Sequence, residues 1–467
     1  MEFNQLIFPF LFLPASFLLY RIVPGRAKNI CLLLLSLLFI VWGSVQDLLL
    51  IVISIVFNYF TGLRIGAQKS EDKPKGAALT LVTGIIVNVL FLGYFKYFDF
   101  ITGNINALFG AHLQKAALTA PVGVSFFTFS VLSYLIDIYR DDAKAEKNVL
   151  TFALFVTFFP KLGSGPIIRY KDMAPQMHRR RLTGEMTEEG VRLFLIGLFK
   201  KVLLANQLGS LFYPILSTEN RTALAAWLGA VGYSFLLYDD FSGYSDMAKG
   251  LGNVFGFRLP QNFDYPYDSV SITDFWRRWH ASLGMWFREY VYIPLGGSRC
   301  SKAKNIRNLL AVWLLTGIWH GANWTFMVWG LYHGVLLILE KFVFAKLLDK
   351  LPVILRKILS FLLVMVGWVF FFSPDIGAAF RYLGSMVGVG GGLFDPDALY
   401  AFTSFAVLLA LCAFFALPVA ENALKKLEAK EPIWLKPAEI VLFAVLFCFA
   451  IAAMTGDTYV TFLYAQF

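Results

Sequence analysis

One histidine of this sequence lies between two apolar runs, in a setting suited to acid–base chemistry. It belongs to the segment LTGIWHGANW, residues 315–324, in which Gly317 and Gly321 flank His320 and Asn323 follows. Glycine is unfavourable inside a helix, so the two glycines indicate a helix break or a close backbone approach. Ionisable groups within a membrane are costly, and they usually line a cavity or take part in the function.

The chemistry that suits His320 is general base catalysis. Imidazole titrates near neutral pH, so it can take a proton from an acceptor hydroxyl while that oxygen attacks an acyl carbon. The C-terminal end of a helix also favours the protonated imidazole, because the helix dipole is negative at that end. A structural alternative stays open, namely a packing histidine bonded to a backbone carbonyl. His333, deeper in the next apolar run, fits that structural interpretation better.

A second histidine, His280, lies in a long polar stretch, residues 257–307. The stretch is too polar to span a membrane, and its basic residues favour the cytoplasmic side. Ser271 and Asp274 have the spacing of a capping box, which predicts an amphipathic helix from there to about residue 291. His280 lies at the border of the apolar face of that helix, where a histidine is usually a structural residue or extends to the interface.

A group of acids and hydroxyls ends another apolar run. The nonapeptide YDDFSGYSD, which ends at Asp246, contains three carboxylates. Carboxylates so near a span do not face lipid. Two interpretations stay open: the group orients a substrate through Ser242, Tyr244 and Asp246, or its acids pair with Arg277 and Arg278.

The elements that must position these residues are membrane helices. The chain has 467 residues, of which 58% are apolar and only 15% charged, against about 25% charged in soluble domains. This composition excludes an ordinary soluble enzyme, a disordered chain and a disulfide-stapled secreted module. The four cysteines have no metal-ligand spacing, and we expect no bound cofactor, no metal and no nucleic acid. The start lacks a positive n-region, so we expect no cleaved signal peptide.

Apolar runs suited to helices recur along the whole chain. The sequence predicts an all-α polytopic membrane protein with roughly 11 transmembrane helices, plus re-entrant and amphipathic helices. We expect one membrane-embedded domain over residues 1–467, with a cytoplasmic amphipathic-helix loop at about 257–307. The runs lie near residues 5–20, 30–43, 47–62, 77–98, 121–138, 149–160, 191–213, 223–238, 308–319, 324–340, 353–372, 400–418 and 437–455.

The basic residues set the expected orientation, because Lys and Arg gather in cytoplasmic loops. They follow the first and third runs and recur at 341–357 and 425–436, while the Gly-rich stretch 373–399 has few. This pattern places both termini outside. The net charge of +10 mainly reflects this bias; the alternative is a basic face for an acidic partner, such as a coenzyme A phosphate or an acidic carrier protein.

Motifs for other chemistries are missing from the sequence. It contains no phosphate-binding GxxxxGK[ST], no HExxH and no GxSxG. Asp395-Pro396-Asp397 has the D-x-D form of metal-dependent glycosyltransferases. Three residues without further context are weak evidence for that activity.

Several segments together resemble the membrane-bound O-acyltransferase family, in the bacterial branch that contains alginate O-acetylase and the teichoic-acid D-alanyltransferase. They cover most of residues 120–334 in the family's order. The segments are APVGVSFFTF (120–129), FPKLGSGPIIR (159–169), residues 238–248, FWRRWH (275–280), residues 286–297 and TGIWHGANWT (316–325).

The resemblance implies a helical, funnel-shaped fold that moves an acyl group from a cytoplasmic thioester to a hydroxyl on the outer side. It implies that His320 is the family's invariant histidine and His280 its second, less constant one. One departure is Ser130, where the family pattern leads us to expect Gln. The residues expected to place or contact the substrates are Asn323, Trp319, Trp279, Ser242, Tyr244 and Asp246.

The C-terminal residues also resemble this branch, whose members tend to end in a short aromatic motif. The tail here is TFLYAQF, and the expected topology places Tyr464 outside. A phenol can accept the acyl group covalently and pass it on. The alternative is an aromatic residue of the membrane interface. Ala465 is smaller than the aromatic residue that the resemblance leads us to expect.

These expectations combine into one main hypothesis, a membrane enzyme that O-acetylates an extracytoplasmic polysaccharide. The acyl donor is expected to be acetyl-coenzyme A or an acyl-carrier thioester, with a periplasmic or extracellular SGNH-type partner and a location in the bacterial inner membrane. D-alanyl transfer to teichoic acid is the alternative within the enzyme class. A transporter of polysaccharide or of a lipid-linked precursor is the alternative from another class, since polar groups in broken helices also suit a transport path.

Overall fold

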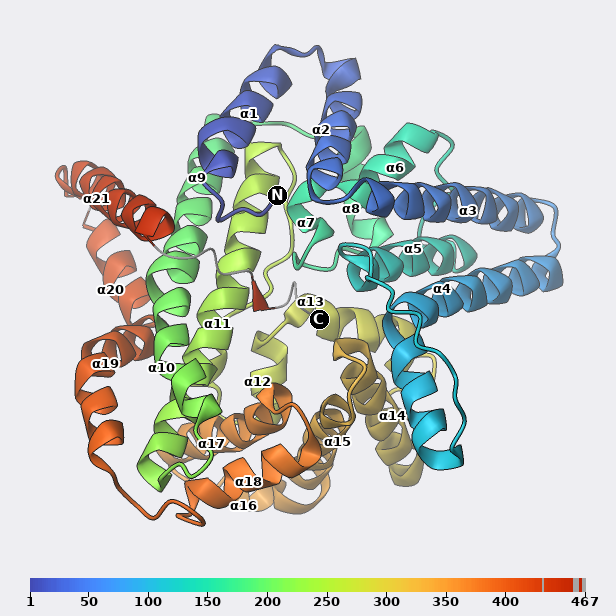
Figure 1. Cartoon of the computed structure of the whole chain (residues 1–467). Helices are drawn as coiled ribbons and strands as arrows, with labels where there is room; N and C mark the ends of the chain where they lie inside the picture. Colours follow the sequence, from blue (N-terminus) through green and yellow to red (C-terminus); the bar gives the residue numbers. More distant parts are fainter. Residues whose placement is uncertain (431, 457–461, 464–467) are drawn as a thin grey trace. The chain divides into compact units, whose positions relative to one another are not determined.

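The structure is a computed structural model that describes residues 1–430, 432–456 and 462–463 of the chain. The described residues form helices joined by turns and loops, and no strand (Figure 1). The all-α fold predicted from the sequence is confirmed.

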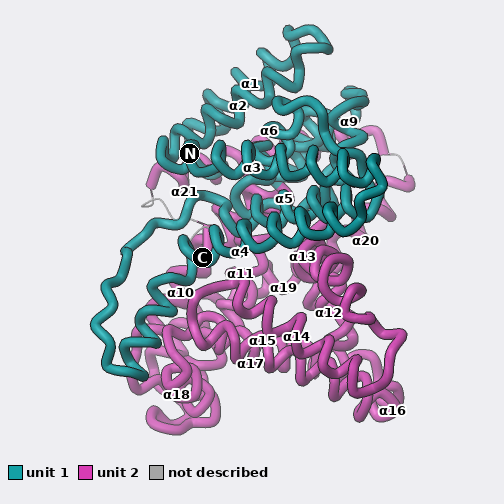
Figure 2. Tube along the Cα trace, turned by 90° about the vertical axis from the view of Figure 1, so that its right-hand side faces the viewer, with its two compact units in different colours: residues 1–194, 247–260 teal, residues 195–246, 261–467 magenta. Residues whose placement is uncertain are grey.

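The chain packs as two compact units, drawn in two colours in Figure 2. Unit 1 comprises residues 1–194 and 247–260, and unit 2 comprises residues 195–246 and 261–467. Two helices, α9 (Gly184–Phe199) and α11 (Ala223–Val254), contribute residues to both units. The single domain over 1–467 stays a prediction.

Unit 1 is built from the N-terminal helices. Asn58 and Asn88 exchange side-chain hydrogen bonds of 3.0 and 2.8 Å between α3 and α4, the kind of polar contact that holds apolar helices together. Apart from parts of α9 and α11, its elements are η1 (Phe8–Phe12), α1 (Leu13–Ile22), η2 (Gly25–Ala27), α2 (Lys28–Gly43), α3 (Val45–Ser70), α4 (Pro74–Phe109), α5 (Val124–Tyr139), α6 (Val149–Thr157), α7 (Phe159–Leu162) and α8 (Tyr170–His178).

Unit 2 contains both histidines of interest and an aromatic core. Trp279, Trp329 and Trp368 are among its largest fully buried side chains. Its elements are η3 (Lys200–Ala205), α10 (Asn206–Ser217), η4 (Pro266–Asp268), α12 (Ile272–Arg278), α13 (Ala281–Phe287), η5 (Arg288–Tyr292), α14 (Lys302–His320), α15 (Trp324–Leu339), η6 (Glu340–Phe344), α16 (Ala345–Leu348), α17 (Val353–Phe372), α18 (Ile376–Met386), α19 (Pro396–Phe415), α20 (Val419–Glu428) and α21 (Leu435–Gly456).

Among the described residues, 6 helices are long and apolar enough to cross a membrane. Two shorter apolar helices cover Phe8–Ile22 and Val124–Tyr139. These helices fit a multi-pass membrane protein, while the count of about 11 spans stays a prediction. The 6 are Gly25–Gly43, Val45–Ser70, Pro74–Phe109, Val353–Phe372, Pro396–Phe415 and Leu435–Gly456.

The amphipathic helix expected from Ser271 to about residue 291 begins as predicted but does not run through. Ser271 caps its start, since its hydroxyl accepts from the backbone N–H of Asp274 at 3.1 Å. The helix then ends at Arg278, and a second helix starts after His280, whose φ is 45°. The expectation of one continuous helix is therefore wrong, and the break lies at the histidine itself.

The D-x-D sequence at Asp395 has a structural explanation. Its carboxylate caps the start of α19 by accepting from the backbone N–H of Ala398 at 2.7 Å, and it also accepts from the hydroxyl of Thr222. An aspartate at this position satisfies the free amides of the first helical turn.

Candidate active site

The helices α14 and α15 form a tightly packed hairpin that carries His320 at its turn (Figure 1). Glycines allow the close approach. A Cβ on Gly317 would lie 2.3 Å from the carbonyl oxygen of Phe326, and one on Gly330 would lie 2.3 Å from that of Trp313. Gly317, one of the two glycines that suggested a break or a close approach, thus packs two backbones together, and the helix ends at His320, directly before Gly321.

His320 lies at the last position of α14, only 3% exposed and enclosed by aromatic rings. The ring of Trp329 meets it edge-on at a centroid distance of 4.8 Å, and that of Phe371 at 5.2 Å. The preceding Trp319 is 4.9 Å away. This enclosure excludes water from the imidazole, which strengthens any electrostatic or proton-transfer interaction made there.

Asn323 shapes the turn after His320. Its side-chain oxygen caps α15 by accepting from the backbone N–H of Thr325 at 3.0 Å, and its amide donates to the carbonyl of Pro374 at 2.8 Å. Both polar ends of this side chain therefore hold the turn in place. Its predicted contact with a substrate stays a prediction.

His280 is fixed by Asn262, a residue that our sequence reasoning missed. The Nδ1 atom of His280 lies 3.0 Å from Oδ1 of Asn262, which also accepts from the backbone N–H of Ser282 at 3.2 Å. A backbone N–H can only donate, so this contact identifies the Asn262 atom as oxygen. Nδ1 of His280 must then donate its proton, which leaves the lone pair on Nε2.

The environment of His280 keeps its imidazole neutral. The side chain is 2% exposed and lies between α12 and α13, outside the helices long enough to span a membrane. Burial lowers the pKa of His280 to about 3, because a charged imidazole loses its hydration there. At neutral pH this residue therefore offers an acceptor at Nε2, and it is better suited to orienting a hydrogen-bond donor than to storing a proton.

Trp319 lies close to both histidines. Its ring centroid is 6.0 Å from that of His280 and 4.9 Å from that of His320. The structure thus brings together three of the residues predicted for the site. Trp279, by contrast, is packed in the aromatic core, 4.9 Å from Trp368.

The histidine not assigned to the site, His333, is packed as a structural residue. It is completely buried, and its Nδ1 accepts from the indole N–H of Trp276 at 3.3 Å. Its neighbours include the rings of Trp313 and Trp329.

The helix α11 connects the acidic cluster to His280. The ring of Phe241 meets that of His280 edge-on at 4.7 Å, and one turn later Ser245 accepts from the side-chain amide of Asn262 at 3.0 Å. Ser242 lies between them, fully buried, and its hydroxyl has no hydrogen-bond partner among the described residues. This part of α11 therefore forms a wall beside His280.

The acids of α11 do not pair with the arginines of α12. Arg278 instead pairs with Asp274 within its own helix, at 3.0 Å. Two of the three acids pair with lysines of η3: Lys200 lies 2.7 Å from Asp246, and Lys201 pairs with Asp240. Two lysines inside the apolar run 191–213 were a signal available in the sequence, because buried amines need acidic partners.

The predicted acyl carrier Tyr464 lies outside the described residues. Tyr244, another predicted contact, is directed to the C-terminal segment, since its ring meets that of Phe462 edge-on at 4.9 Å. Among the residues that the structure describes, no group of three His, Cys, Asp or Glu side chains is placed to hold a metal ion.

Comparison with known proteins identifies the family. The model of the membrane-bound O-acyltransferase family matches residues 35–373 of this chain. The chain belongs to the membrane-bound O-acyltransferase family. It is thus an O-acyltransferase of a multi-pass membrane class, and the resemblance noted from its motifs is confirmed.

Individual relatives of this O-acyltransferase match over different shares of the chain. The probable alginate O-acetylase AlgI of Azotobacter vinelandii is 41% identical over 423 residues, 90% of this chain and 84% of that protein. The peptidoglycan O-acetyltransferase of Helicobacter pylori is 38% identical over 83% of this chain and 80% of that protein. The teichoic acid D-alanyltransferase of Bacillus subtilis is 31% identical over 48% of this chain and 60% of that protein.

Proposed function

We propose that this protein transfers an acetyl group from a thioester on the cytoplasmic side to hydroxyl groups of an extracytoplasmic polysaccharide. Membership of the O-acyltransferase family supports the reaction type. Relatives that act as O-acetylating enzymes on alginate and peptidoglycan support acetyl as the group and polysaccharide as the acceptor. The observation that carries the proposal is that two buried histidines, His280 and His320, both lie close to the ring of Trp319.

In the proposed reaction His320 is the general base. Its imidazole takes the proton of the acceptor hydroxyl while that oxygen attacks the carbonyl carbon of the thioester. A carbon–oxygen ester bond forms, the carbon–sulfur bond breaks, and the departing sulfur takes the proton back from the imidazole. The aromatic enclosure of His320 keeps water from competing for the acyl group.

His280 has a different part in this proposal. Because Asn262 holds the proton on Nδ1, the Nε2 atom faces its surroundings as an acceptor. We propose that Nε2 orients one of the two substrates, the thioester or the acceptor molecule, by accepting a hydrogen bond from it. Its low pKa argues against a second base, since an effective base has a pKa near the working pH.

A two-step route through Tyr464 fits the same chemistry. The acyl group would pass first from the thioester to the phenol oxygen and then from that ester to the acceptor hydroxyl. Each step forms one ester bond and releases one leaving group, a thiol in the first step and the phenol in the second.

The proposal includes an orientation and partners. We place the protein in the bacterial inner membrane with both termini outside, as the distribution of basic loops indicates. Acetyl-coenzyme A or an acyl-carrier thioester is the donor, and an SGNH-type partner on the outer side completes transfer to the polymer. D-alanyl transfer is less well supported, because the teichoic acid D-alanyltransferase matches a smaller share of the chain.

The test is acetylation by the purified full-length protein in lipid nanodiscs with labelled acetyl-coenzyme A and a polysaccharide acceptor. We compare His320→Phe, which keeps the ring contacts with Trp329 and Phe371, with His320→Ala. His333→Phe is the matched control, the same change at a buried histidine outside the site. Loss of label transfer in both His320 variants and its retention in His333→Phe are expected. Parental activity in a folded His320 variant would refute the mechanism.

A further inference from the structure

The described part of the C-terminal segment is buried in unit 2. Phe462 is 1% exposed and Leu463 is 8% exposed. A buried backbone N–H needs a hydrogen-bond acceptor, so the contacts made by these two residues show what holds the segment in place.

A buried ion pair holds them. Nζ of Lys201, on η3, lies 2.5 Å from Oδ1 of Asp240, on α11, and the two side chains are 2% and 3% exposed. Oδ2 of the same carboxylate accepts from the backbone N–H of Leu463 at 2.9 Å. The ammonium of Lys201 also lies 4.6 Å from the ring of Phe462.

Both members of this ion pair also contact the C-terminal segment. A buried pair needs further hydrogen bonds to the remaining lone pairs to offset its lost hydration. Here the backbone of Leu463 supplies one and the face of Phe462 supplies a cation–π contact. Lys200 and Asp246 form a second pair between the same two elements at 2.7 Å, and this pair makes no hydrogen bond or ion pair with Phe462 or Leu463, the described residues of the C-terminal segment.

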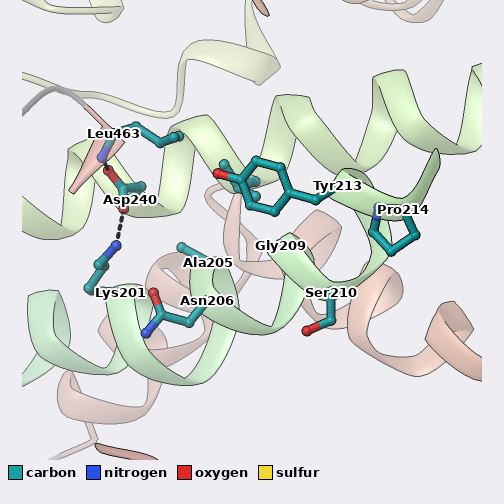
Figure 3. Close-up of a pocket in the computed structure, with 10 residues that line it drawn as sticks. Lys201, Ala205, Asn206, Gly209, Ser210, Tyr213, Pro214, Asp240 and Leu463 are labelled. Carbon is teal, nitrogen blue, oxygen red and sulfur yellow. Dashed lines mark hydrogen bonds and ion pairs between the residues drawn. The ribbon is translucent and has the colours of Figure 1, made fainter. Parts of the chain in front are cut away.

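The held segment lies at a cavity of about 320 Å³ in unit 2 (Figure 3). Lys201, Asp240 and Leu463 lie together at one end of it, and Tyr213 and Pro214 lie toward the other. Ligand pockets begin at about 300 Å³. Asn206 also lines the cavity, and its side-chain oxygen is buried without a hydrogen-bond partner among the described residues.

We infer that Lys201 and Asp240 form a docking site for the C-terminal segment, which fixes the chain directly before Tyr464 at this cavity. Asp240 is the acceptor that holds the backbone, and Lys201 pairs with that carboxylate and orients it. Both are positioning residues.

The docking itself does not depend on the proposed function, but its effect on acyl transfer does. Tyr464 follows Leu463 directly in the sequence. If the phenol relays the acyl group, the docked segment determines how often it meets the thioester and the acceptor. Loss of docking then lowers kcat and leaves the KM for the acyl donor unchanged.

The docking is tested with two double variants of the full chain in nanodiscs. Lys201→Met with Asp240→Asn keeps a side-chain acceptor for the Leu463 amide, whereas Lys201→Met with Asp240→Leu removes it. Both replace the ion pair without leaving one charge buried alone, so both should fold. The matched control is Lys200→Met with Asp246→Leu, at the neighbouring pair.

The measurement is hydrogen exchange of the C-terminal peptide. We expect exchange at Leu463 to be about tenfold faster or more in the Asp240→Leu variant than in the Asp240→Asn variant, the effect of losing such a hydrogen bond. The control should exchange like the parent protein. Equal exchange in the two Lys201 variants, or the same acceleration in the control, overturns the docking site.

A second readout separates the docking from the relay. Acyl mass on the Tyr464 peptide during turnover should fall about tenfold in the Asp240→Leu variant, in proportion to the lost docking. Faster exchange without any acylated peptide in the parent protein supports the docking and overturns the relay. Unchanged acylation despite faster exchange overturns the positioning role of Lys201 and Asp240.

Discussion

Asn262 determines which nitrogen of His280 carries the proton. Its Oδ1 atom lies 3.0 Å from Nδ1 of His280 and accepts from both the backbone N–H and the hydroxyl of Ser282. The same contacts start α13 immediately after the histidine. Asn262 thus determines both where the helix is interrupted and which tautomer the imidazole adopts.

This relationship predicts opposite outcomes for two substitutions of similar size. Asn262→Leu removes the acceptor of three donors, so we expect a loss of about 1–3 kcal/mol in the free energy of unfolding. Acetylation per folded molecule should fall about ten- to hundredfold, as for other residues that orient a functional histidine. Asn262→Asp keeps an acceptor and should retain most activity at neutral pH. Equal loss of activity in both variants, measured by label transfer, would contradict the tautomer argument.

The low pKa of His280 predicts how stability changes with pH. The unfolded chain binds a proton near pH 6.5, whereas the folded chain binds it only near pH 3. Between these values the unfolded state holds more protons, so stability falls as the pH falls, by about 1.4 kcal/mol per pH unit from this group. Above pH 6.5 the group has no such effect.

His280→Asn isolates this contribution. Asparagine tolerates the left-handed backbone conformation that His280 adopts, so the variant should fold. Thermal unfolding followed from pH 7.5 to pH 4.5 should show a smaller decrease in Tm for the variant than for the parent protein. Parallel curves over this range would mean that His280 is charged in the folded protein.

Much of the helical architecture follows from local sequence patterns. Apolar runs such as 47–62 and 353–372 lie inside the helices α3 and α17, because helices satisfy the backbone in an apolar surrounding. The capping box at Ser271 was also readable, since it depends on a residue three positions away. The break at His280 was not, because the partner that forces it, Asn262, is 18 residues distant in the sequence.

The same distinction holds for the candidate site. His320 stood out from its own neighbours in the sequence, and the structure places it beside Trp319. The partners of the α11 acids could not be recognised in this way. Arginines of the long polar stretch were as plausible as Lys200 and Lys201, which are the partners in the structure. Which cation pairs with a buried carboxylate depends on tertiary packing, because folding decides which side chain comes to lie next to it.

The close packing of α14 on α15 predicts different effects for two glycines. Gly317→Ala places a methyl group 2.3 Å from the carbonyl oxygen of Phe326, a backbone atom that cannot move alone. We expect the free energy of unfolding to fall by about 1–3 kcal/mol or more and the position of His320 to change, with loss of activity.

Gly284→Ala is the matched control in the neighbouring helix α13. A Cβ there meets its nearest neighbour at an ordinary 3.7 Å. The substitution should stabilise the helix by about 1 kcal/mol, the difference between alanine and glycine in a helix interior. Thermal unfolding of both variants decides the matter, and a tolerated Gly317→Ala would show that the hairpin is looser than described.

Asn323 allows the structural and substrate-binding interpretations to be separated. Asn323→Ala removes the cap of α15 and the donor to the Pro374 carbonyl, so we expect about 1–2 kcal/mol lower stability. Asn323→Asp keeps the cap and loses only the donor. If the side chain serves the turn alone, KM for the acceptor stays unchanged in both variants, and activity follows the folded fraction. A raised KM in Asn323→Asp, with its cap intact, would instead place this side chain against the acceptor.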